Sequence, residues 1–418
     1  MGVPNEQIMK QYINAPLSKV RRRINSFIAL FFIGTIPLFA HAGGLGMAPL
    51  VAIIGAVGWL TVSHYKDFKP SPPIICLFVF LFWAAITSLW SPYKTDNFLS
   101  NPFKLIVGVC LFLGSFRAIK AVIKDKPIIL RHLFWAINIL ACGFILIDCF
   151  SGYSLTFLID PISEGESLNQ RRADAEMNIG HSVTVLLLFV GVMSANLIQR
   201  YKYGWVLTSL YFIFLIWASH TAELEVGILV SILIFFTLLA SKVSPLKTLE
   251  IAVLIAVMSI LMPPITKFIL PYLEAETLPL SWQHRTAMWE YTANKIWEAP
   301  LWGHGFDAVR TFDETMTLGA VDDWPIVSLH PHNVGLHIWV ETGFIGVILA
   351  ALTLILFGRQ ALFIARKSNG FAMALSAVII AATIVSAVTY GVWQHWWWAC
   401  IMFSSILVHM CFAESEYN

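Results

Sequence analysis

The stretch from His330 to Phe357, HPHNVGLHIWVETGFIGVILAALTLILF, decides how this chain folds. Residues 334–357 are almost all apolar, and about 20 such residues form one helix across a bilayer core. The start of the stretch instead gathers three imidazoles, an amide and a carboxylate: His330, His332, Asn333, His337 and Glu341. Polar side chains at a membrane boundary are costly unless they have a role, so the stretch predicts a membrane helix with a functional site at its start.

The composition of the whole chain agrees with a membrane protein. Of its 418 residues, 58% are hydrophobic and 12% are charged, and the mean hydropathy is +0.73. Soluble domains carry about 25% charged residues. A net charge of +2 favours no nucleic-acid partner. The first apolar run lacks a signal-peptide cleavage site, so we expect a retained helix. All six cysteines lie in apolar runs and predict neither disulfides nor a thiolate metal site.

Apolar runs of the required length predict an all-α integral membrane protein with about twelve transmembrane helices. We expect one polytopic membrane domain over residues 1–418, with a large loop at 271–333 between the ninth and tenth helices. The predicted helices cover residues 24–40, 46–63, 73–90, 103–118, 128–150, 179–198, 203–219, 224–241, 249–270, 334–357, 371–389 and 396–412.

The distribution of basic residues predicts the orientation of these helices. Alternate connections, together with the N-terminal segment, hold 19 of the 27 Lys and Arg residues. The side richer in Lys and Arg faces the cytoplasm, so both termini are predicted there. Loops 151–178 and 271–333 then lie on the opposite face. The aromatic run at 393–398, WQHWWW, resembles a belt that contacts membrane lipids at that face.

Loop 271–333 carries two patterns that point to a site. Residues 282–298 can form one amphipathic helix on which Arg285 and Trp289, one turn apart, share a face. Gly303 and Gly305 within the following PLWGHGF permit a tight turn. The alternative interpretation is an interfacial helix that only anchors the loop.

The histidines suggest proton transfer. A neutral imidazole such as His332 is suited to accept a proton near neutral pH. Asn333, His337 and Glu341 follow one another at four-residue spacing and should line one helix stripe, although packing is a more common role for a histidine in the position of His337. His330 and His332 also resemble a zinc ligand pair, but a third ligand at recognised spacing is missing, so no metal is predicted.

Two other sets of charged residues have competing interpretations. Arg171 and Arg172 in loop 151–178 are suited to bidentate phosphate binding, but nearby acidic residues make a surface ion-pair cluster equally easy. Asp322 and Asp323 could bind a divalent cation, and a solvated turn is the simpler interpretation.

Two motifs resemble a known family. His332-Asn333, nine further residues and Gly343-x-x-Gly346 are similar to the signature of bacterial O-antigen ligases and the related O-antigen polymerases. Arg285-x-x-x-Trp289 followed by EAPLWGHGF at 298–306 looks like the second hallmark of that family. The resemblance implies a membrane-embedded glycosyltransferase of the GT-C class that inverts the anomeric carbon without metal or cofactor.

The resemblance also implies substrates, a location and roles. The donor would be a glycan on undecaprenyl pyrophosphate, the acceptor a hydroxyl of lipid A–core oligosaccharide, and the location the periplasmic side of a bacterial inner membrane. His332 would be the general base and Arg285 would hold the pyrophosphate. The remaining expected substrate-binding residues near them are Trp289, His330, Asn333, His337 and Glu341.

The resemblance leaves two questions open. Many relatives carry a second arginine where this chain has Ala222, so Arg171, Arg172 or Arg310 would have to substitute for it. A ligase is favoured over an O-antigen or exopolysaccharide polymerase because one outer loop dominates. A transporter of lipid-linked oligosaccharide is less favoured, because polar residues gather at one surface and the helix centres are apolar.

Overall fold

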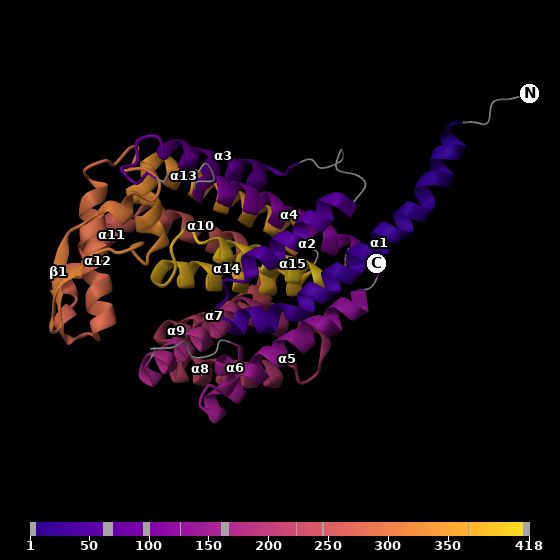
Figure 1. The fold of residues 1–418 in the computed structure, drawn as a ribbon, viewed down its shortest axis with the longest axis horizontal. Helices are drawn as coiled ribbons and strands as arrows, with labels where there is room; N and C mark the ends of the chain where they lie inside the picture. The colour runs from indigo at the N-terminus through magenta and orange to yellow at the C-terminus, as the bar shows by residue number, and fades with distance from the viewer. Residues whose placement is uncertain are drawn as a thin grey trace, which may run out of the picture. The chain divides into compact units, whose positions relative to one another are not determined.

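The computed structural model is mostly helical (Figure 1). It describes residues 6–61, 70–94, 101–125, 127–159, 167–222, 224–244, 246–366 and 368–412. The prediction of an all-α membrane protein is confirmed, with one exception. Residues 315–325 form an antiparallel hairpin of β1 (Thr315–Leu318) and β2 (Val321–Pro325), which places Asp322 and Asp323 on an exposed strand.

The longer helices are α1 (Glu6–His41), α2 (Met47–Thr61), α3 (Pro72–Thr87), α4 (Asn101–Asp125), α5 (Pro127–Ser151), α7 (Leu168–Arg200), α8 (Gly204–Thr221), α9 (Glu225–Val243), α10 (Lys247–Ile260), α12 (Leu280–Ile296), α13 (Val334–Ala365), α14 (Asn369–Val388) and α15 (His395–Phe412). The short helices are α6 (Ser154–Ile159), α11 (Met262–Ile269), η2 (Leu270–Tyr272), η3 (Ala275–Thr277) and η4 (Ala308–Thr311).

Each of the twelve predicted apolar stretches overlaps a helix, and residues 62 and 63 of the second stretch lie outside the described part of the chain. Within the described part of the chain, nine helices are long and apolar enough to cross a membrane, and the α10–α11 pair would make ten as one bent span. The shorter apolar helices α2 and α3 account for the last two stretches. The chain is therefore a multi-pass membrane protein, while the count of twelve spans stays a prediction.

The predicted helix over 249–270 is broken into α10 and α11. The chain bends by 70° between α10 and α11. Pro263 and Pro264 lie in the first turn of α11, as its sequence shows. Proline lacks the backbone N–H that would continue the preceding helix, so a new helix starts there.

The prediction that residues 151–178 form a loop was wrong. Helix α6 lies within this range, residues 160–166 fall outside the described part, and α7 begins at Leu168. Ser167 caps α7 by accepting a hydrogen bond from the Gln170 amide at 3.2 Å. The first turns of α7 are polar, so the apolar signal that marks a membrane helix begins eleven residues after the helix itself.

The chain divides into two compact units. Unit 1 contains residues 1–68, 108–225 and 396–418, and unit 2 contains residues 69–107 and 226–395. In unit 1, α7 packs against α1, α5 and α8. In unit 2, α13 packs against α3, α10, α12 and α14, and Figure 1 shows α11, α12 and β1 gathered together. A single domain stays a prediction.

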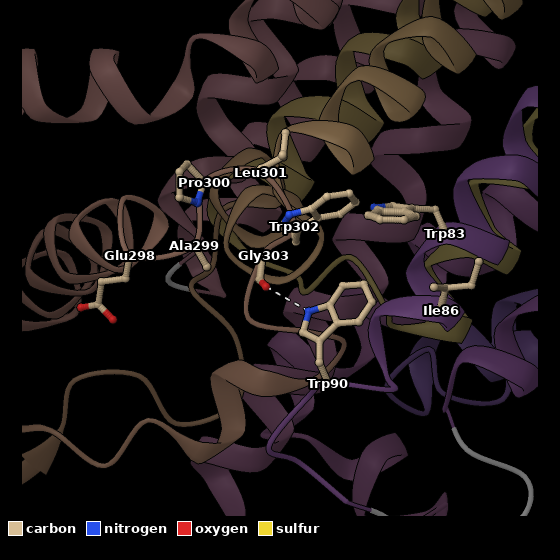
Figure 2. A pocket seen from close by; sticks show the side chains of 9 residues that line it. All are labelled: Trp83, Ile86, Trp90, Glu298, Ala299, Pro300, Leu301, Trp302 and Gly303. Atoms are coloured by element: carbon tan, nitrogen blue, oxygen red, sulfur yellow. Dashed lines mark hydrogen bonds between the residues drawn. The ribbon is translucent and has the colours of Figure 1, made fainter.

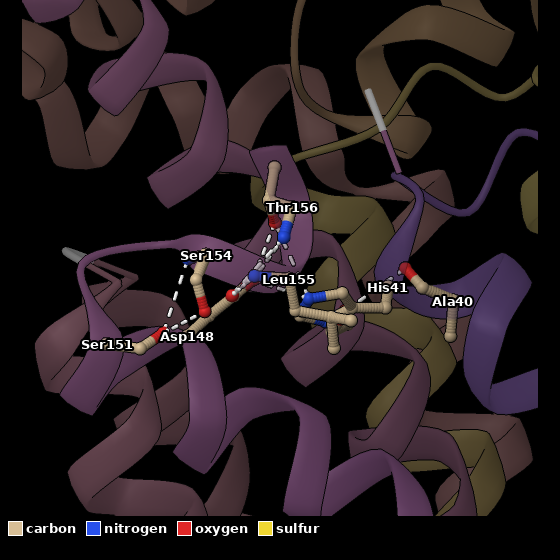
Figure 3. Close-up of polar contacts among 8 residues, drawn as sticks. Ala40, His41, Asp148, Ser151, Ser154, Leu155 and Thr156 are labelled. Carbon is tan, nitrogen blue, oxygen red and sulfur yellow. Dashed lines mark hydrogen bonds and ion pairs between the residues drawn. The ribbon is translucent and has the colours of Figure 1, made fainter. Parts of the chain in front are cut away.

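A buried cluster of hydrogen-bonded polar side chains connects helices of unit 1 (Figure 3). Asp148 Oδ2 lies 2.6 Å from His41 Nε2 and accepts the Thr156 hydroxyl at 2.6 Å. Asp148 Oδ1 accepts the backbone N–H of Leu155 at 2.7 Å, and Ser182 Oγ lies 3.4 Å from His41 Nδ1. The order Ser–His–Asp is that of a hydrolase triad. His41, Asp148 and Ser182 are however at most 2% exposed, so substrate has no access and the cluster holds α1, α5, α6 and α7 together.

We expect Asp148→Ala to lower the free energy of unfolding by roughly 3–5 kcal/mol, because it leaves the buried imidazole and two N–H groups of α6 without their acceptor. Thermal unfolding in detergent measures this change. Ser151→Ala is the control, since its exposed hydroxyl contacts the hydroxyl and the backbone N–H of Ser154 and takes no part in the buried cluster. It should change stability by no more than about 0.5 kcal/mol. Equal stability of both variants would contradict the anchoring role.

Candidate active site

The candidate site lies where the loop of unit 2 enters α13. Asn333 is the N-cap of α13, and its side-chain oxygen accepts the Leu336 amide at 3.0 Å. His332, directly before the cap, has a left-handed backbone with φ of 46°. A side chain other than glycine is uncommon in this region, and such strained residues cluster at functional sites.

The ring of His332 has one defined partner. Its Nδ1 lies 2.6 Å from the backbone oxygen of Thr389, at the end of α14. A carbonyl oxygen only accepts, so Nδ1 carries the proton and the lone pair of the neutral ring lies on Nε2. This tautomer presents a proton acceptor at Nε2.

Neighbouring charges keep the ring neutral. Burial, followed by the Arg285 guanidinium, lowers the pKa of His332 to about 4, against the opposing effect of the Thr389 carbonyl. Burial and the neighbouring His332, His337 and Arg310 lower the pKa of His330 to about 2. The centroids of the His330 and His332 rings are 4.3 Å apart. Both imidazoles are therefore uncharged bases at neutral pH.

Helix α12 brings Arg285 to this cluster. Trp289, one turn after Arg285 as predicted, donates its indole N–H to the Pro331 oxygen at 3.0 Å and so joins α12 to the histidine segment. The Arg285 guanidinium stacks over Trp282 at 5.2 Å and donates to the Ser281 oxygen at 3.2 Å. These contacts orient a half-buried cation beside His332.

Glu341 is wholly buried and holds protein groups. Its carboxylate accepts the Trp393 indole N–H at 2.5 Å and the backbone N–H groups of Asp307 and Val309 at 2.9 and 3.3 Å. His337 Nε2 lies 3.3 Å away. A buried carboxylate is costly unless it is hydrogen-bonded, and three N–H donors meet that requirement. These contacts favour a positioning role, while direct substrate binding by Glu341 stays a prediction.

His337 also faces protein. Its Nδ1 accepts the Val392 backbone N–H at 3.2 Å, so in the neutral ring the proton lies on Nε2, toward Glu341. The side chain is 3% exposed. These contacts favour the packing role preferred from the sequence, and substrate binding by His337 stays a prediction. The predicted stripe of His337 and Glu341 on one helix is confirmed by their contact.

A break in α13 connects the two sequence motifs. Gly343 has φ of 64°, which interrupts the helix. The Phe344 amide donates to the Pro300 oxygen at 2.9 Å, while the Val340 and Glu341 oxygens accept the amides of His304 and Gly305 at 2.8 and 2.9 Å. The turn after α12 thus completes the hydrogen bonding that the break leaves open.

A side chain at Gly343 or at Gly303 would not fit at this contact. A Cβ on Gly343 would lie 2.3 Å from the Leu301 oxygen, and one on Gly303 would lie 2.4 Å from the Glu341 oxygen. Gly303 and Gly305 have φ of 72° and 102°, as expected for the predicted tight turn.

Arg310 is a second cation in the same unit. It lies at the end of η4, where its Nε donates to Asp307 Oδ1 at 3.1 Å and its guanidinium stacks over Tyr93 at 5.7 Å. Its charge contributes, after burial and the neighbouring histidines, to the lowered pKa of His330. Arg171 and Arg172 instead lie on α7 in unit 1, with Arg171 buried and Arg172 exposed. The other eight predicted site residues all lie in unit 2.

The sequence did not indicate three residues that shape the site. Thr389, Val392 and Trp393 reach it from the connection after α14. The prediction of a lipid-facing belt was wrong for Trp393, Trp396 and Trp397, which are only 7%, 6% and 2% exposed. Aromatic runs occur both in belts and in protein interiors. The one signal in the sequence was the carboxylate of Glu341, which needs hydrogen-bond donors such as an indole N–H when it is buried.

Among the residues that the structure describes, no three His, Cys, Asp or Glu side chains are grouped as metal ligands. His330 and His332 also each use a ring nitrogen on protein, in contacts with the His332 amide and the Thr389 oxygen. Metal independence stays a prediction.

The fold and site define a multi-pass membrane protein whose polar centre combines neutral histidines and arginines beside a broken helix. A family model described as O-antigen ligase matches residues 206–351, which include Arg285, His332 and Gly343. Over this range the chain is similar to the O-antigen ligase family, in agreement with the resemblance seen in the sequence.

Curated relatives carry a related, provisional name. A provisionally named polysaccharide ligase of Rickettsia felis is 33% identical over 38% of this chain and 40% of its own length. Similarly named proteins of Rickettsia conorii and Rickettsia typhi are 34% and 28% identical over 35% and 54% of this chain, and 37% and 54% of their own lengths. The chain thus matches about half or less of each relative. No solved structure matches it.

We expect Gly343→Ala to destabilise the protein by about 2 kcal/mol or more, because a left-handed alanine is strained by itself and its Cβ meets the Leu301 oxygen. Thermal unfolding in detergent tests this. Gly143→Ala is the matched control, since a Cβ there meets nothing within 4 Å and the helix favours alanine. A Gly343→Ala protein as stable as Gly143→Ala would contradict the role of the break.

Proposed function

We propose that this protein is an O-antigen ligase that transfers a glycan from undecaprenyl pyrophosphate to a hydroxyl of lipid A–core oligosaccharide. The reaction takes place at the periplasmic side of a bacterial inner membrane, with both termini in the cytoplasm. It follows a metal-independent, inverting mechanism of the GT-C class. The match of residues 206–351 to the O-antigen ligase family model and the polysaccharide ligase names of the relatives support the reaction class.

One observation carries the mechanism: the hydrogen bond of 2.6 Å from His332 Nδ1 to the Thr389 oxygen. It fixes the tautomer in which Nε2 accepts a proton. A general base needs both this orientation and a neutral ring, and burial together with Arg285 keeps the ring neutral. His332 is therefore assigned as the base that receives the proton of the acceptor hydroxyl.

Arginines beside the base suit an anionic leaving group. Arg285 is already fixed by its stacking on Trp282, and Arg310 lies near His330 in the same unit. A pyrophosphate leaving group gains negative charge as its bond to the sugar breaks, and oriented cations stabilise that charge. We assign Arg285 to the pyrophosphate. Arg310 is preferred as the second arginine, with Arg171 and Arg172 as the other candidates.

The reaction then balances in one displacement. The acceptor oxygen attacks the anomeric carbon from the face opposite the pyrophosphate while its proton passes to His332 Nε2. The bond from the anomeric carbon to the pyrophosphate oxygen breaks, and its electron pair leaves with the lipid pyrophosphate. Attack from the opposite face inverts the anomeric configuration.

We expect His332→Ala to lower kcat/KM by roughly 10²–10⁴, the usual contribution of a general base. The assay measures transfer from a lipid-linked glycan to lipid A–core with EDTA present. The control is His132→Ala, an exposed histidine on α5 in unit 1, which should keep wild-type activity.

Three outcomes of this assay would change the proposal. Normal transfer by His332→Ala would remove the assignment of the base. Lengthening of the lipid-linked glycan without acceptor would identify a polymerase. Loss of wild-type transfer in EDTA, restored by a divalent metal, would exclude the metal-independent mechanism.

The pH dependence of kcat/KM follows from the lowered pKa of His332. The base works in its deprotonated form, so activity should stay level from pH 8 to about pH 5 and fall only as the pH approaches about 4. Arg285→Gln removes the charge that helps to lower this pKa. Its residual activity should therefore fall at a higher pH than that of the wild type. A fall in wild-type kcat/KM near pH 6.5, the ordinary pKa of histidine, would contradict the lowered pKa of His332.

A further inference from the structure

Unit 2 contains an apolar groove of about 710 Å³ beside the turn that completes α13 (Figure 2). One wall comes from the end of α3 and the residues after it, and the other wall comes from the turn after α12. The lining residues are Trp83, Ile86, Trp90, Glu298, Ala299, Pro300, Leu301, Trp302 and Gly303. Ligand pockets typically measure about 300–1,000 Å³, so a sizeable apolar group fits.

Two of the three tryptophans have their polar atoms turned into protein. Trp83 donates its indole N–H to the Thr342 oxygen at 2.9 Å, and Trp90 donates to the Gly303 oxygen at 3.1 Å. Figure 2 shows the second of these bonds. Trp83 lies 5.8 Å from Trp302 and 5.9 Å from Trp90 between ring centroids. The rings therefore form a preformed wall that offers hydrocarbon surface.

The groove leaves large apolar side chains accessible. Trp302 is 53% exposed, Leu301 45% and Trp90 40%. Glu298 is the one charged lining residue, and Figure 2 shows it away from Trp83 and Ile86. Burying such surface against an apolar ligand is favourable, whereas a sugar would find few hydrogen-bond partners here.

The segment that lines the groove continues into the active site. Gly303 lies in the groove, and the Gly305 backbone N–H donates to the Glu341 backbone oxygen. Arg310 donates to Asp307, whose backbone N–H donates to the Glu341 carboxylate. Arg310 is seven positions after Gly303, so at most about 25 Å of chain separates the apolar groove from this cation. A ligand with an anionic head and a long apolar tail matches both ends.

We propose that this groove binds the polyisoprenoid tail of the lipid pyrophosphate donor, near the end of the tail that carries the pyrophosphate. The inference rests on the proposed function and extends it by assigning Trp83, Trp90 and Trp302 to donor recognition. Their role is binding, so it acts on KM for the donor and leaves proton transfer at His332 unchanged.

The first test compares two donors that carry the same glycan. One has the full undecaprenyl tail, and the other, the short donor, has a methyl group in place of the tail. Trp302→Ala should raise KM for the undecaprenyl donor about ten-fold, equivalent to one lost aromatic contact. For the short donor, KM and kcat should stay within about two-fold of the wild type.

The matched control is Trp297→Ala. Trp297 is 55% exposed, close to the 53% of Trp302, and lies five residues earlier in the chain. It contacts Lys267 at 5.7 Å and does not line the groove. This variant should leave KM for both donors unchanged. An equal rise in KM for both donors in Trp302→Ala, or the same rise in Trp297→Ala, would overturn the assignment.

A binding measurement separates this inference from the proposed reaction. A benzophenone-bearing polyisoprenyl pyrophosphate should label residues 298–303 of the wild type on irradiation, and undecaprenyl phosphate should compete. Equal competition by phospholipid would identify an ordinary lipid groove and overturn the proposal. Competed labelling without glycan transfer from any donor would support the groove while rejecting the ligase reaction.

Discussion

The site of unit 2 depends on the break in α13 at Gly343. A helix that ends or breaks in an apolar environment leaves carbonyl and amide groups without partners, and each must find one. The turn after α12 supplies them, since Pro300, His304 and Gly305 exchange backbone hydrogen bonds with Phe344, Val340 and Glu341. This contact fixes the turn, and through it the residues that follow, against the start of α13.

The Glu341 carboxylate adds hydrogen bonds of its own to that backbone contact. It belongs to the residue two positions before Gly343 and holds the backbone of Asp307 and Val309 together with the Trp393 indole. Three segments from distant parts of the sequence therefore meet around one buried charge. A carboxylate that is removed from water needs hydrogen-bond donors on both oxygens. The segments that supply these donors are therefore held in fixed positions.

The two motifs that resemble the O-antigen ligase signature, around Gly343 and around Gly303, form the two sides of this backbone contact. Gly343 and Gly303 leave room for each other's backbone, and Arg285 and His332 lie on the segments thus joined. The same turn lines the tryptophan groove. The break at Gly343 therefore links the positions of His332, Arg285 and the apolar groove. The separate cluster around Asp148 performs a comparable fastening role within unit 1.

The sequence determined what hydrophobicity and local spacing can encode. It predicted the helical membrane fold, the approximate positions of the apolar helices, the place of Arg285 and Trp289 one turn apart on one helix and the similarity of residues 206–351 to the O-antigen ligase family. Composition did not reveal the early start of α7, since its first turns are polar, and it did not predict the hairpin in the polar loop. Only the tertiary structure decided the tautomer of His332, the burial of Trp393 and the positioning contacts of Glu341. These features depend on hydrogen bonds between residues 32 to 57 positions apart, which no local pattern of residues specifies.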